Sequence, residues 1–404
     1  MAYDVQAVRA AFPALDQGIA FFDGPGGSQT PTSVAEAVAS TMTSGISNRG
    51  DVTASERRAE WVVKQARAAM GDLLGTDPGG VVFGRSMTAL TYDLARTLSR
   101  GWGPGDEVVV TSLDHDANIR PWVQAAEAVG AGVRWAHFDA DTGRLPVEAV
   151  QEQLSERTRL VAVTAASNVI GTRPDVPAIA AAAHAVGALV HVDAVHLAPH
   201  APLDRARLGA DVIACSPYKF FGPHCGVQAA DPVLLETLHP AKLAPSTDRV
   251  PERFELGTLP YELLAGTTAA VDFIAGLDPE ATGDRRARIA ASLAAATEHE
   301  DSLRGRLEAR LQEVDGLVSY SRAGDRTPTV YFTVEGIESL RLSRHVAAEG
   351  VNAPCSNFYA IEASRRLGLG DGGAVRAGIS AYTDDDDVDR LVDALHDAVA
   401  ELRC

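Results

Sequence analysis

The chain has 404 residues and a formal net charge of −18 at pH 7. Because nucleic acids and anionic membranes bind basic surfaces, this charge argues against both as partners. The sequence shows no apolar run long enough to span a bilayer and no signal-peptide core, so we expect a cytoplasmic protein. The spacing of its cysteines predicts neither a disulfide framework nor a metal site. The four cysteines are Cys215, Cys225, Cys355 and Cys404.

Short apolar stretches alternate with helix-like ones from about residue 50 to residue 230. Many of the Ala-rich helical stretches end at a glycine, as helices often do. This alternation predicts an α/β fold with a mostly parallel central sheet that is covered by helices on both faces. The predicted strands are 81–83, 107–111, 132–138, 159–165, 188–194, 211–216 and 226–230.

The pattern changes after the break GLDPEATGD, and the rest predicts a smaller α+β domain. We therefore expect three parts: an N-terminal arm (1–25) that joins the small domain, a large domain (26–270) and the small C-terminal domain (271–404). The run of four aspartates that begins at Asp384 suits a helix N-terminus better than a metal site. The predicted elements of the small domain are helices 283–314, 338–349 and 384–402 and the strands in LVSYS, TVYFTV and VRAGIS.

Two glycine-containing stretches have different interpretations. GWGPG, from Gly101 to Gly105, precedes a strand, whereas a dinucleotide-binding loop follows one, so we interpret it as a turn. In FGRSMTALTYDLAR a strand leads through a short turn into a helix. Ser86, Met87 and Thr88 would then lie at a helix N-terminus, which suits a phosphate but equally an ordinary serine cap.

One lysine lies in an aromatic, turn-rich stretch, ACSPYKFFGPHCG. Lys219 could extend its ammonium to water or contact an aromatic ring. A desolvated lysine also has a lowered pKa and can attack a carbonyl carbon. The residues at the other strand ends decide between these interpretations.

Polar residues follow several of the predicted strands. Asp193 ends one strand, and His115 and Asn168 follow two others. Each could be a turn, cap or structural residue on its own. The carboxyl ends of parallel strands share one edge of the sheet, where open α/β folds bind ligands. A phosphate cradle, an imidazole, a carboxylate and a buried lysine at one edge match the needs of pyridoxal 5'-phosphate.

Over nearly the whole chain the sequence resembles the class V aminotransferase and cysteine desulfurase family, closest to its cysteine desulfurase-like branch. The motifs that carry the resemblance are DHDAN, SNVIGT, HVDAVH, CSPYKFFGPHCG and FELGT. The resemblance implies the fold type I architecture of pyridoxal-phosphate enzymes and a homodimer with shared active sites. It also implies that Lys219 holds the cofactor aldehyde and moves protons, that Asp193 pairs with the pyridine nitrogen and that His115 stacks on the ring.

The resemblance assigns further residues. His196 would contact the ring hydroxyl, where the family usually has glutamine. Ser216 and the turn from Ser86 to Thr88 would hold the phosphate, and Thr258 would reach the phosphate of the other subunit. Substrate binding is expected from loops near Gly24–Gly27, Asn48–Arg49 and Asn352–Tyr359, and from Tyr218. The substrate-binding residues so implied are Gly26, Asn48, Arg49, Asn168, Tyr218, Cys355 and Arg376.

Departures from the family pattern bear on the reaction. Tyr218 replaces the histidine that commonly precedes the lysine, and Tyr359 stands where desulfurases have their persulfide cysteine. Cys355, four residues upstream, is either a displaced nucleophile or a residue at the substrate entrance. We therefore expect β-elimination of cysteine or an S-substituted cysteine, which needs no protein thiol.

Several other functions stay open. Desulfuration with a persulfide at Cys355 is the first alternative. Transamination, epimerisation and decarboxylative deamination follow. A cofactor-binding protein without turnover is disfavoured because Lys219, Asp193 and His115 are all present.

Overall fold

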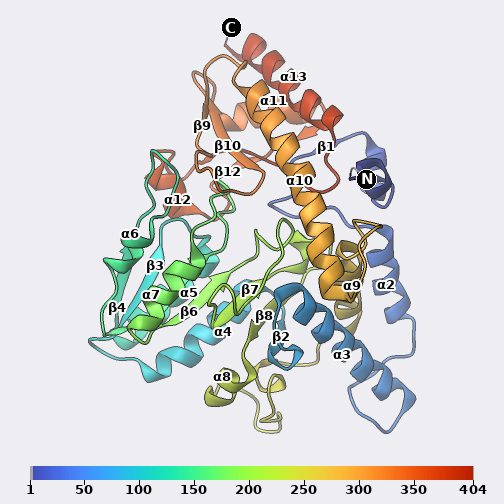
Figure 1. Ribbon diagram of the computed structural model, residues 1–404, viewed down its shortest axis with the longest axis vertical. Coiled ribbons are helices and arrows are strands. Elements are labelled where there is room, and N and C mark those ends of the chain that lie inside the picture. The colour runs from blue at the N-terminus through green and yellow to red at the C-terminus, as the bar shows by residue number, and fades with distance from the viewer. Residues whose placement is uncertain (1–2, 404) are drawn as a thin grey trace.

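The computed structural model describes residues 3–403, which form a large α/β part and a smaller α+β part (Figure 1). A seven-stranded sheet lies in the large part, with the strand order β2-β8-β7-β6-β5-β3-β4. Strand β8 is antiparallel to both neighbours, whereas the pairs from β7 to β4 are parallel. The predicted mostly parallel sheet is therefore confirmed. The strands are β2 Val81–Gly84, β3 Glu107–Thr111, β4 Gly132–Ala136, β5 Thr158–Thr164, β6 Leu189–Asp193, β7 Val212–Cys215 and β8 Gly226–Ala230.

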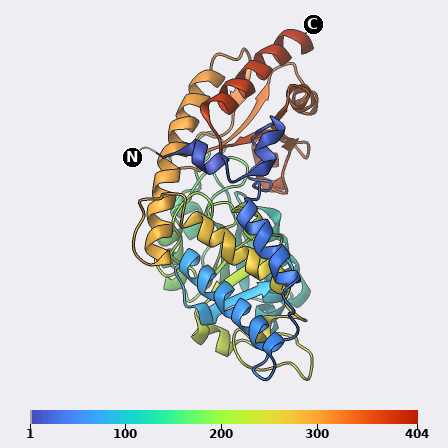
Figure 2. The same ribbon diagram turned by 90° about the vertical axis from the view of Figure 1, so that its right-hand side faces the viewer.

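Helices cover both faces of this sheet, as the alternating pattern predicts. On one side α9 packs against both α2 and α3, and the three helices lie side by side in Figure 2. The helices of the large part are α2 Thr32–Met42, α3 Ala54–Leu74, α4 Met87–Leu98, α5 Arg120–Val129, α6 Val147–Gln151, α7 Val176–Ala185, α8 Pro232–Thr237 and α9 Tyr261–Ile274.

The smaller part is built on a four-stranded antiparallel sheet with the order β12-β13-β10-β9. The long helix α10 runs beside both parts in Figure 1. The helices are α10 Arg285–Leu311, α11 Ser339–Ala348, α12 Ile361–Arg366 and α13 Asp385–Leu402, and the strands are β9 Leu317–Ser319, β10 Thr329–Val334, β12 Cys355–Ser356 and β13 Ala374–Gly378.

The N-terminal segment contacts the smaller part. After helix α1 (Val5–Arg9), strand β1 (Ala20–Phe21) pairs in parallel with β11 (Val351–Asn352). Tyr3 donates a hydrogen bond to the carbonyl of Ala381 at 2.9 Å. The domain boundaries themselves stay a prediction.

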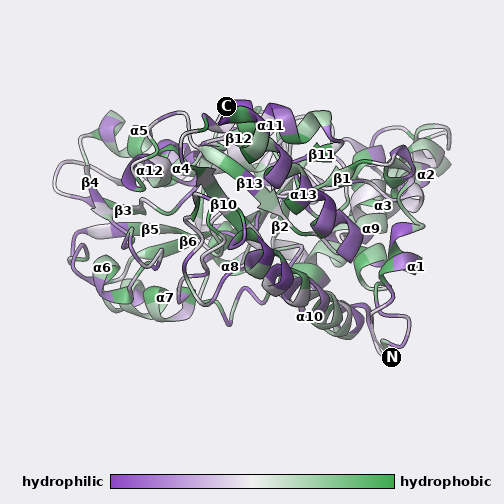
Figure 3. Ribbon diagram, turned by 90° about the horizontal axis from the view of Figure 1, so that it is seen from above, coloured by the Kyte–Doolittle hydropathy of each residue, from purple (hydrophilic) through white to green (hydrophobic). Residues whose placement is uncertain are grey.

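Helix ends follow local sequence signals. Thr53 and Glu56 form a capping box at the start of α3, and Gly75 ends that helix with a φ of 62°. Asp384 caps α13 in the same way, with Asp387 as its partner. The prediction that the aspartate run begins a helix is confirmed. As Figure 3 shows, α10 and α13 present hydrophilic residues along their outer sides.

Apolar residues fill three main cores. Two cover the two faces of the large sheet, and the third lies between the small sheet and its helices. Strand β3 is buried along its whole length, as expected of a parallel strand covered on both faces. Within residues 3–403, no helix is both long and apolar enough to cross a membrane.

Candidate functional site

A cavity of about 320 Å³ lies at the carboxyl ends of the parallel strands, where residues of the small part close it. Most of the residues selected from the sequence line it, although they come from segments up to 350 positions apart. The lining comprises Pro25, Gly26, Ser86, Met87, Thr88, His115, Ala117, Thr164, Ala166, Asn168, Asp193, Val195, His196, Ser216, Tyr218, Lys219, Ser356, Phe358, Tyr359 and Arg376.

Lys219 follows β7 in a short 3-10 turn and reaches back to the N-terminal loop. Its Nζ donates hydrogen bonds to the carbonyls of Pro25 at 2.5 Å and Gly26 at 2.9 Å. It also lies 4.9 Å from the centre of the Tyr218 ring. Burial lowers the pKa of Lys219 to about 7, with Arg376 acting in the same direction and Asp193 opposing it. The amine is therefore neutral in a substantial fraction near neutral pH.

Asp193 and His115 lie on the same cavity. The Oδ1 of Asp193 accepts a hydrogen bond from the backbone N–H of Val195 at 2.9 Å. Burial raises the pKa of Asp193 to about 6, and a cation beside it would favour its ionised form. The Nδ1 of His115 accepts from the N–H of Ala117 at 3.0 Å, so its Nε2 carries the proton of the neutral ring. Burial lowers the pKa of His115 to about 4, which keeps the ring neutral.

The turn from Ser86 to Thr88 forms the start of α4, as the sequence predicts. Ser86 is the N-cap, and its hydroxyl accepts from the N–H of Ala89 at 3.1 Å. The start of β8 packs tightly on this turn, because a Cβ on Gly226 would lie 2.1 Å from the carbonyl carbon of Ser86. A glycine there lets the helix N-terminus reach the cavity. This arrangement fits an anion held by backbone N–H groups.

Arg376 is almost fully buried at the opposite wall, on β13. Its Nη1 donates to the carbonyl of Asn168 at 2.9 Å, while its Nε has no hydrogen-bond partner. Burial lowers the pKa of Arg376 to about 9. The Oδ1 of Asn168 is likewise buried and unpaired. Two unsatisfied polar atoms in adjacent side chains indicate a site that a polar ligand completes.

A loop with two consecutive residues of positive φ covers the cavity. Phe358 and Tyr359 have φ values of 50° and 59°, a region that costs energy for side chains of this size. The N–H of Asp116 donates to the carbonyl of Tyr359 at 2.7 Å. The Tyr359 ring stacks near His115 with 5.7 Å between ring centres. Tyr359 is 75% exposed, so it stands at the entrance.

His196 lines the cavity, and its Nε2 is engaged by two threonine hydroxyls. Its Nε2 lies 2.9 Å from the hydroxyl of Thr327 and 3.1 Å from that of Thr329. Burial holds the pKa of His196 well below its usual range, so the ring is neutral. Its role toward a cofactor stays a prediction.

Four of the expected residues do not line the cavity of this chain. Cys355 packs against the core of the small part, and burial raises the pKa of its thiol to about 11. Arg49 instead forms ion pairs with Glu60 at 2.8 Å and Glu252 at 3.0 Å. Asn48 and Thr258 are exposed. Their functional roles stay predictions, and the resemblance assigns Thr258 to the phosphate of the other subunit.

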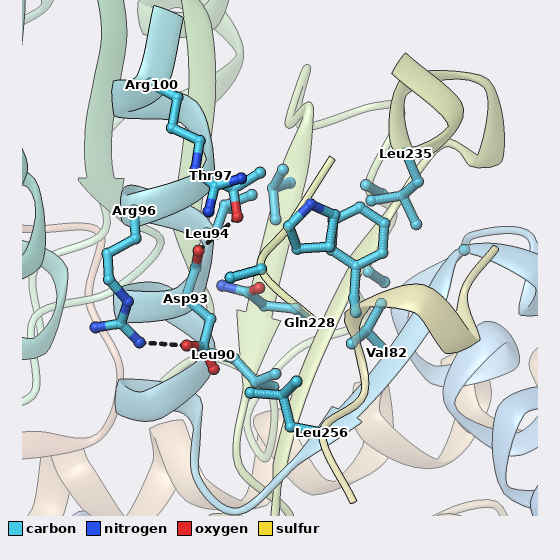
Figure 4. Close-up of a pocket in the computed structure, with 17 residues that line it drawn as sticks. Val82, Leu90, Asp93, Leu94, Arg96, Thr97, Arg100, Gln228, Leu235 and Leu256 are labelled. Carbon is cyan, nitrogen blue, oxygen red and sulfur yellow. Dashed lines mark hydrogen bonds and ion pairs between the residues drawn. The ribbon is translucent and has the colours of Figure 1, made fainter. Parts of the chain in front are cut away.

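A second cavity lies elsewhere, beside the sheet between α4 and β8 (Figure 4). Leu90, Leu94 and Leu235 make much of its wall, and Asp93 and Arg96 form an ion pair at its edge. It contains none of the residues selected from the sequence. The chemistry therefore belongs to the cavity at Lys219.

The sequence did not single out Phe358, Ser356 or Pro25. All three fall within the loops 24–27 and 352–359 that were expected to contact substrate, but nothing marked them individually. Pro25 contributes a backbone oxygen, for which no side-chain signal exists.

Known proteins are similar to this chain along its whole length. The family described as Aminotransferase class-V matches residues 20–391. An uncharacterized protein of Mycobacterium tuberculosis is 37% identical over 98% of this chain and 99% of its own length. A probable cysteine desulfurase of Pseudomonas aeruginosa is 30% identical over 98% of each chain. The crystal structure of the cysteine desulfurase CsdA of Escherichia coli superposes with a TM-score of 0.87, at 26% identity and 99% coverage of both chains. The chain therefore belongs to the class-V aminotransferase family, whose members are pyridoxal-phosphate-dependent enzymes.

Proposed function

We propose that this protein binds pyridoxal 5'-phosphate at Lys219 and cleaves the C–S bond of cysteine or an S-substituted cysteine by β-elimination. The observation that carries the proposal is the composition of the cavity wall. The wall contains an amine of lowered pKa and a buried arginine. None of the described residues that line it is a cysteine. A reaction that needs a protein thiol is therefore less well supported than one that does not.

The residues present fit the cofactor. Lys219 would hold its aldehyde, Asp193 its pyridine nitrogen and His115 the face of its ring. Ser86 and Ser216, with the free N–H groups at the start of α4, would hold the phosphate. When bound, the cofactor supplies an electron sink for the substrate carbon.

Lys219 would act as the base once substrate frees its amine. Its pKa of about 7 suits removal of a proton at neutral pH, because an amine with its ordinary pKa would be protonated. The hydrogen bonds from Nζ to Pro25 and Gly26 fix the position of that amine. It takes the Cα proton and can return one to product.

Arg376 and Asn168 would orient the substrate. The planar guanidinium of Arg376 pairs well with a carboxylate, and its Nε has no partner in this structure. A substrate carboxylate here would leave the side chain directed toward the entrance at Tyr359. This loop would therefore select the group attached to sulfur.

Cysteine desulfuration is the second candidate, and the names of the relatives favour it. The relative from Pseudomonas aeruginosa is named a probable cysteine desulfurase. Desulfuration in this chain would require the thiol of Cys355 to leave the small core and enter the cavity. Its raised pKa of about 11 does not favour the reactive thiolate.

We also propose that the enzyme is a homodimer. Several large apolar side chains are exposed, among them Met42 at 66%, Trp61 at 61% and Leu256 at 60%. Leu256 lies two residues from Thr258, which the resemblance assigns to the partner's phosphate. A second copy that covers Leu256 would bury this side chain and bring Thr258 to the site of the other subunit.

Product analysis tests the proposed reaction. The protein loaded with pyridoxal 5'-phosphate is incubated with L-cysteine and with S-methyl-L-cysteine, and pyruvate and alanine are separated. We expect pyruvate from both substrates. Alanine from L-cysteine, with no turnover of S-methyl-L-cysteine, would instead establish desulfuration.

A further inference from the structure

A third, much smaller cavity adjoins the cavity at Lys219. Lys219, His196 and Pro25 contribute to both cavities. The small cavity has room for roughly one water molecule. Its remaining wall comes from the N-terminal loop, the loops that follow β6 and β7, helix α10 and the segment after β13. The lining residues are Gly24, Pro25, His196, Pro199, His200, Lys219, Phe221, Glu300, Ser380 and Ala381.

Glu300 brings a carboxylate from α10 into this cavity. The residue is 1% exposed. Its Oε2 lies 2.8 Å from the Nδ1 of His200, and its Oε1 is buried without a hydrogen-bond partner. A buried oxygen without a hydrogen-bond partner destabilises the fold, and a charged one does so more strongly. A water molecule in the adjoining space is the simplest partner for it.

The other polar groups around this space limit where a proton can go. His196 is neutral because burial lowers its pKa, and its Nε2 is already engaged by two threonine hydroxyls. Besides the hydroxyl of Ser380, the lining then offers Glu300 with His200 and the amine of Lys219 as titratable groups that can exchange a proton across the cavity.

We propose that this cavity holds a water molecule through which Glu300 exchanges a proton with Lys219. When Lys219 has taken a proton, Nζ passes one to the water, and the water passes one of its own to Oε1 of Glu300. Transfer in the reverse direction returns a proton from Glu300 to Lys219. Only N–H and O–H bonds form and break, and no other reactant is needed. Glu300 is thus a positioning residue that acts on Lys219 through water.

This inference rests on the proposed role of Lys219 as a base. It differs from a purely structural role, in which the pair of Glu300 and His200 only fastens α10 to the large part. A structural role predicts a loss of stability and no specific effect on proton exchange at Lys219. The two roles therefore separate experimentally.

The first test needs no cofactor. A crystal structure of the cofactor-free protein at a resolution that orders water should show one water within hydrogen-bond distance of both Oε1 of Glu300 and Nζ of Lys219. An empty cavity, or a water bound to only one of the two, would overturn the proposal.

The second test follows exchange of the Cα hydrogen of L-alanine in D2O by NMR, with the protein loaded with pyridoxal 5'-phosphate. L-alanine has no leaving group, so proton transfer is seen alone. We expect E300Q to exchange about 10-fold or more slowly than wild type. E298Q removes an exposed charge from the same helix and should exchange at the wild-type rate.

A third variant separates the water from the ion pair. A381V adds two methyl groups to the cavity wall and leaves Glu300 and His200 in place, so it should slow exchange as E300Q does. Equal exchange in wild type, E300Q and A381V would overturn the relay. If wild type itself gives no exchange, the proposed function fails, and the crystallographic water still decides the inference.

Discussion

The guanidinium carbon of Arg376 lies 3.6 Å from the centre of the Phe358 ring. Asn168 contacts both residues. Its side-chain Nδ2 donates to the backbone carbonyl of Phe358 at 3.0 Å, and its backbone carbonyl accepts from Nη1 of Arg376. Phe358 holds a φ of 50°, which is unusual for an aromatic residue. The arginine and the entrance loop are therefore joined through direct contacts, and we expect a substrate that binds one to affect the other.

Replacing this arginine by lysine tests carboxylate binding. R376K keeps a positive charge but loses the planar fork and the contact with Phe358. We expect kcat/KM to fall about 100-fold, mostly through KM, in steady-state kinetics. R366K is the matched control, since Arg366 lies over Phe138 outside the cavity. An unchanged KM in R376K would remove Arg376 from substrate binding.

The ring of Phe358 should matter less, but measurably. F358L retains an apolar side chain and removes the face on which the guanidinium lies. A cation–π contact contributes about 0.5–2 kcal/mol, so we expect KM to rise about 2-fold to 30-fold. Kinetics at several substrate concentrations give KM separately from kcat. A lower KM would indicate that the ring obstructs the site.

The thiol of Cys355 should be dispensable. C355S leaves the cavity wall unchanged, because Cys355 packs against the small core. We expect turnover of L-cysteine and S-methyl-L-cysteine within about 3-fold of wild type. Loss of activity toward L-cysteine of about 100-fold or more would contradict β-elimination and favour a persulfide on Cys355. C225S, at a second buried cysteine, is the control.

The lowered pKa of Lys219 predicts a pH-dependent stability. Burial lowers this pKa from 10.5 to about 7, so between these values the unfolded chain binds a proton that the folded chain does not. The free energy of unfolding of the cofactor-free protein therefore rises with pH across that window. Below about pH 7 the amine is protonated in both states, and burying its charge destabilises the folded protein by the full amount.

K219M removes this cost. Allowing for partial solvent access, we expect the cofactor-free variant to be more stable than wild type by about 1–3 kcal/mol at pH 7. The difference should shrink toward pH 10, as measured by urea unfolding at each pH. K64M, at an exposed lysine, should show no such difference. A gap that is constant with pH would contradict the lowered pKa.

Much of the fold could be predicted because its signals are local. Strand β3 occupies the predicted residues 107–111, and α10 begins just after Asp284, whose side chain caps it. Where predicted and observed element boundaries differ, they differ by only a few residues. Strand β4 ends at Ala136 rather than at residue 138. Helices α2 and α9 were not predicted individually, and both lie outside the strand–helix alternation of about residues 50–230.

The site was predictable where a polar residue type that is seldom needed for structure stands at the end of a buried strand. Lys219, Asp193 and His115 do share one cavity. Cys355 shows the limit, because the side-chain direction in a two-residue strand depends on the pairing of β12 with β13. Glu300 shows it further, since its partner His200 is 100 positions away and no local pattern links them.

The most direct test of the account is the covalent attachment of the cofactor. The protein is incubated with pyridoxal 5'-phosphate, reduced with borohydride, digested and analysed by mass spectrometry. We predict a single modified residue, Lys219, and no modification in K219M under the same conditions. Modification at another lysine, or none in the wild-type protein, would contradict the central claim that the amine of Lys219 carries the chemistry of this site.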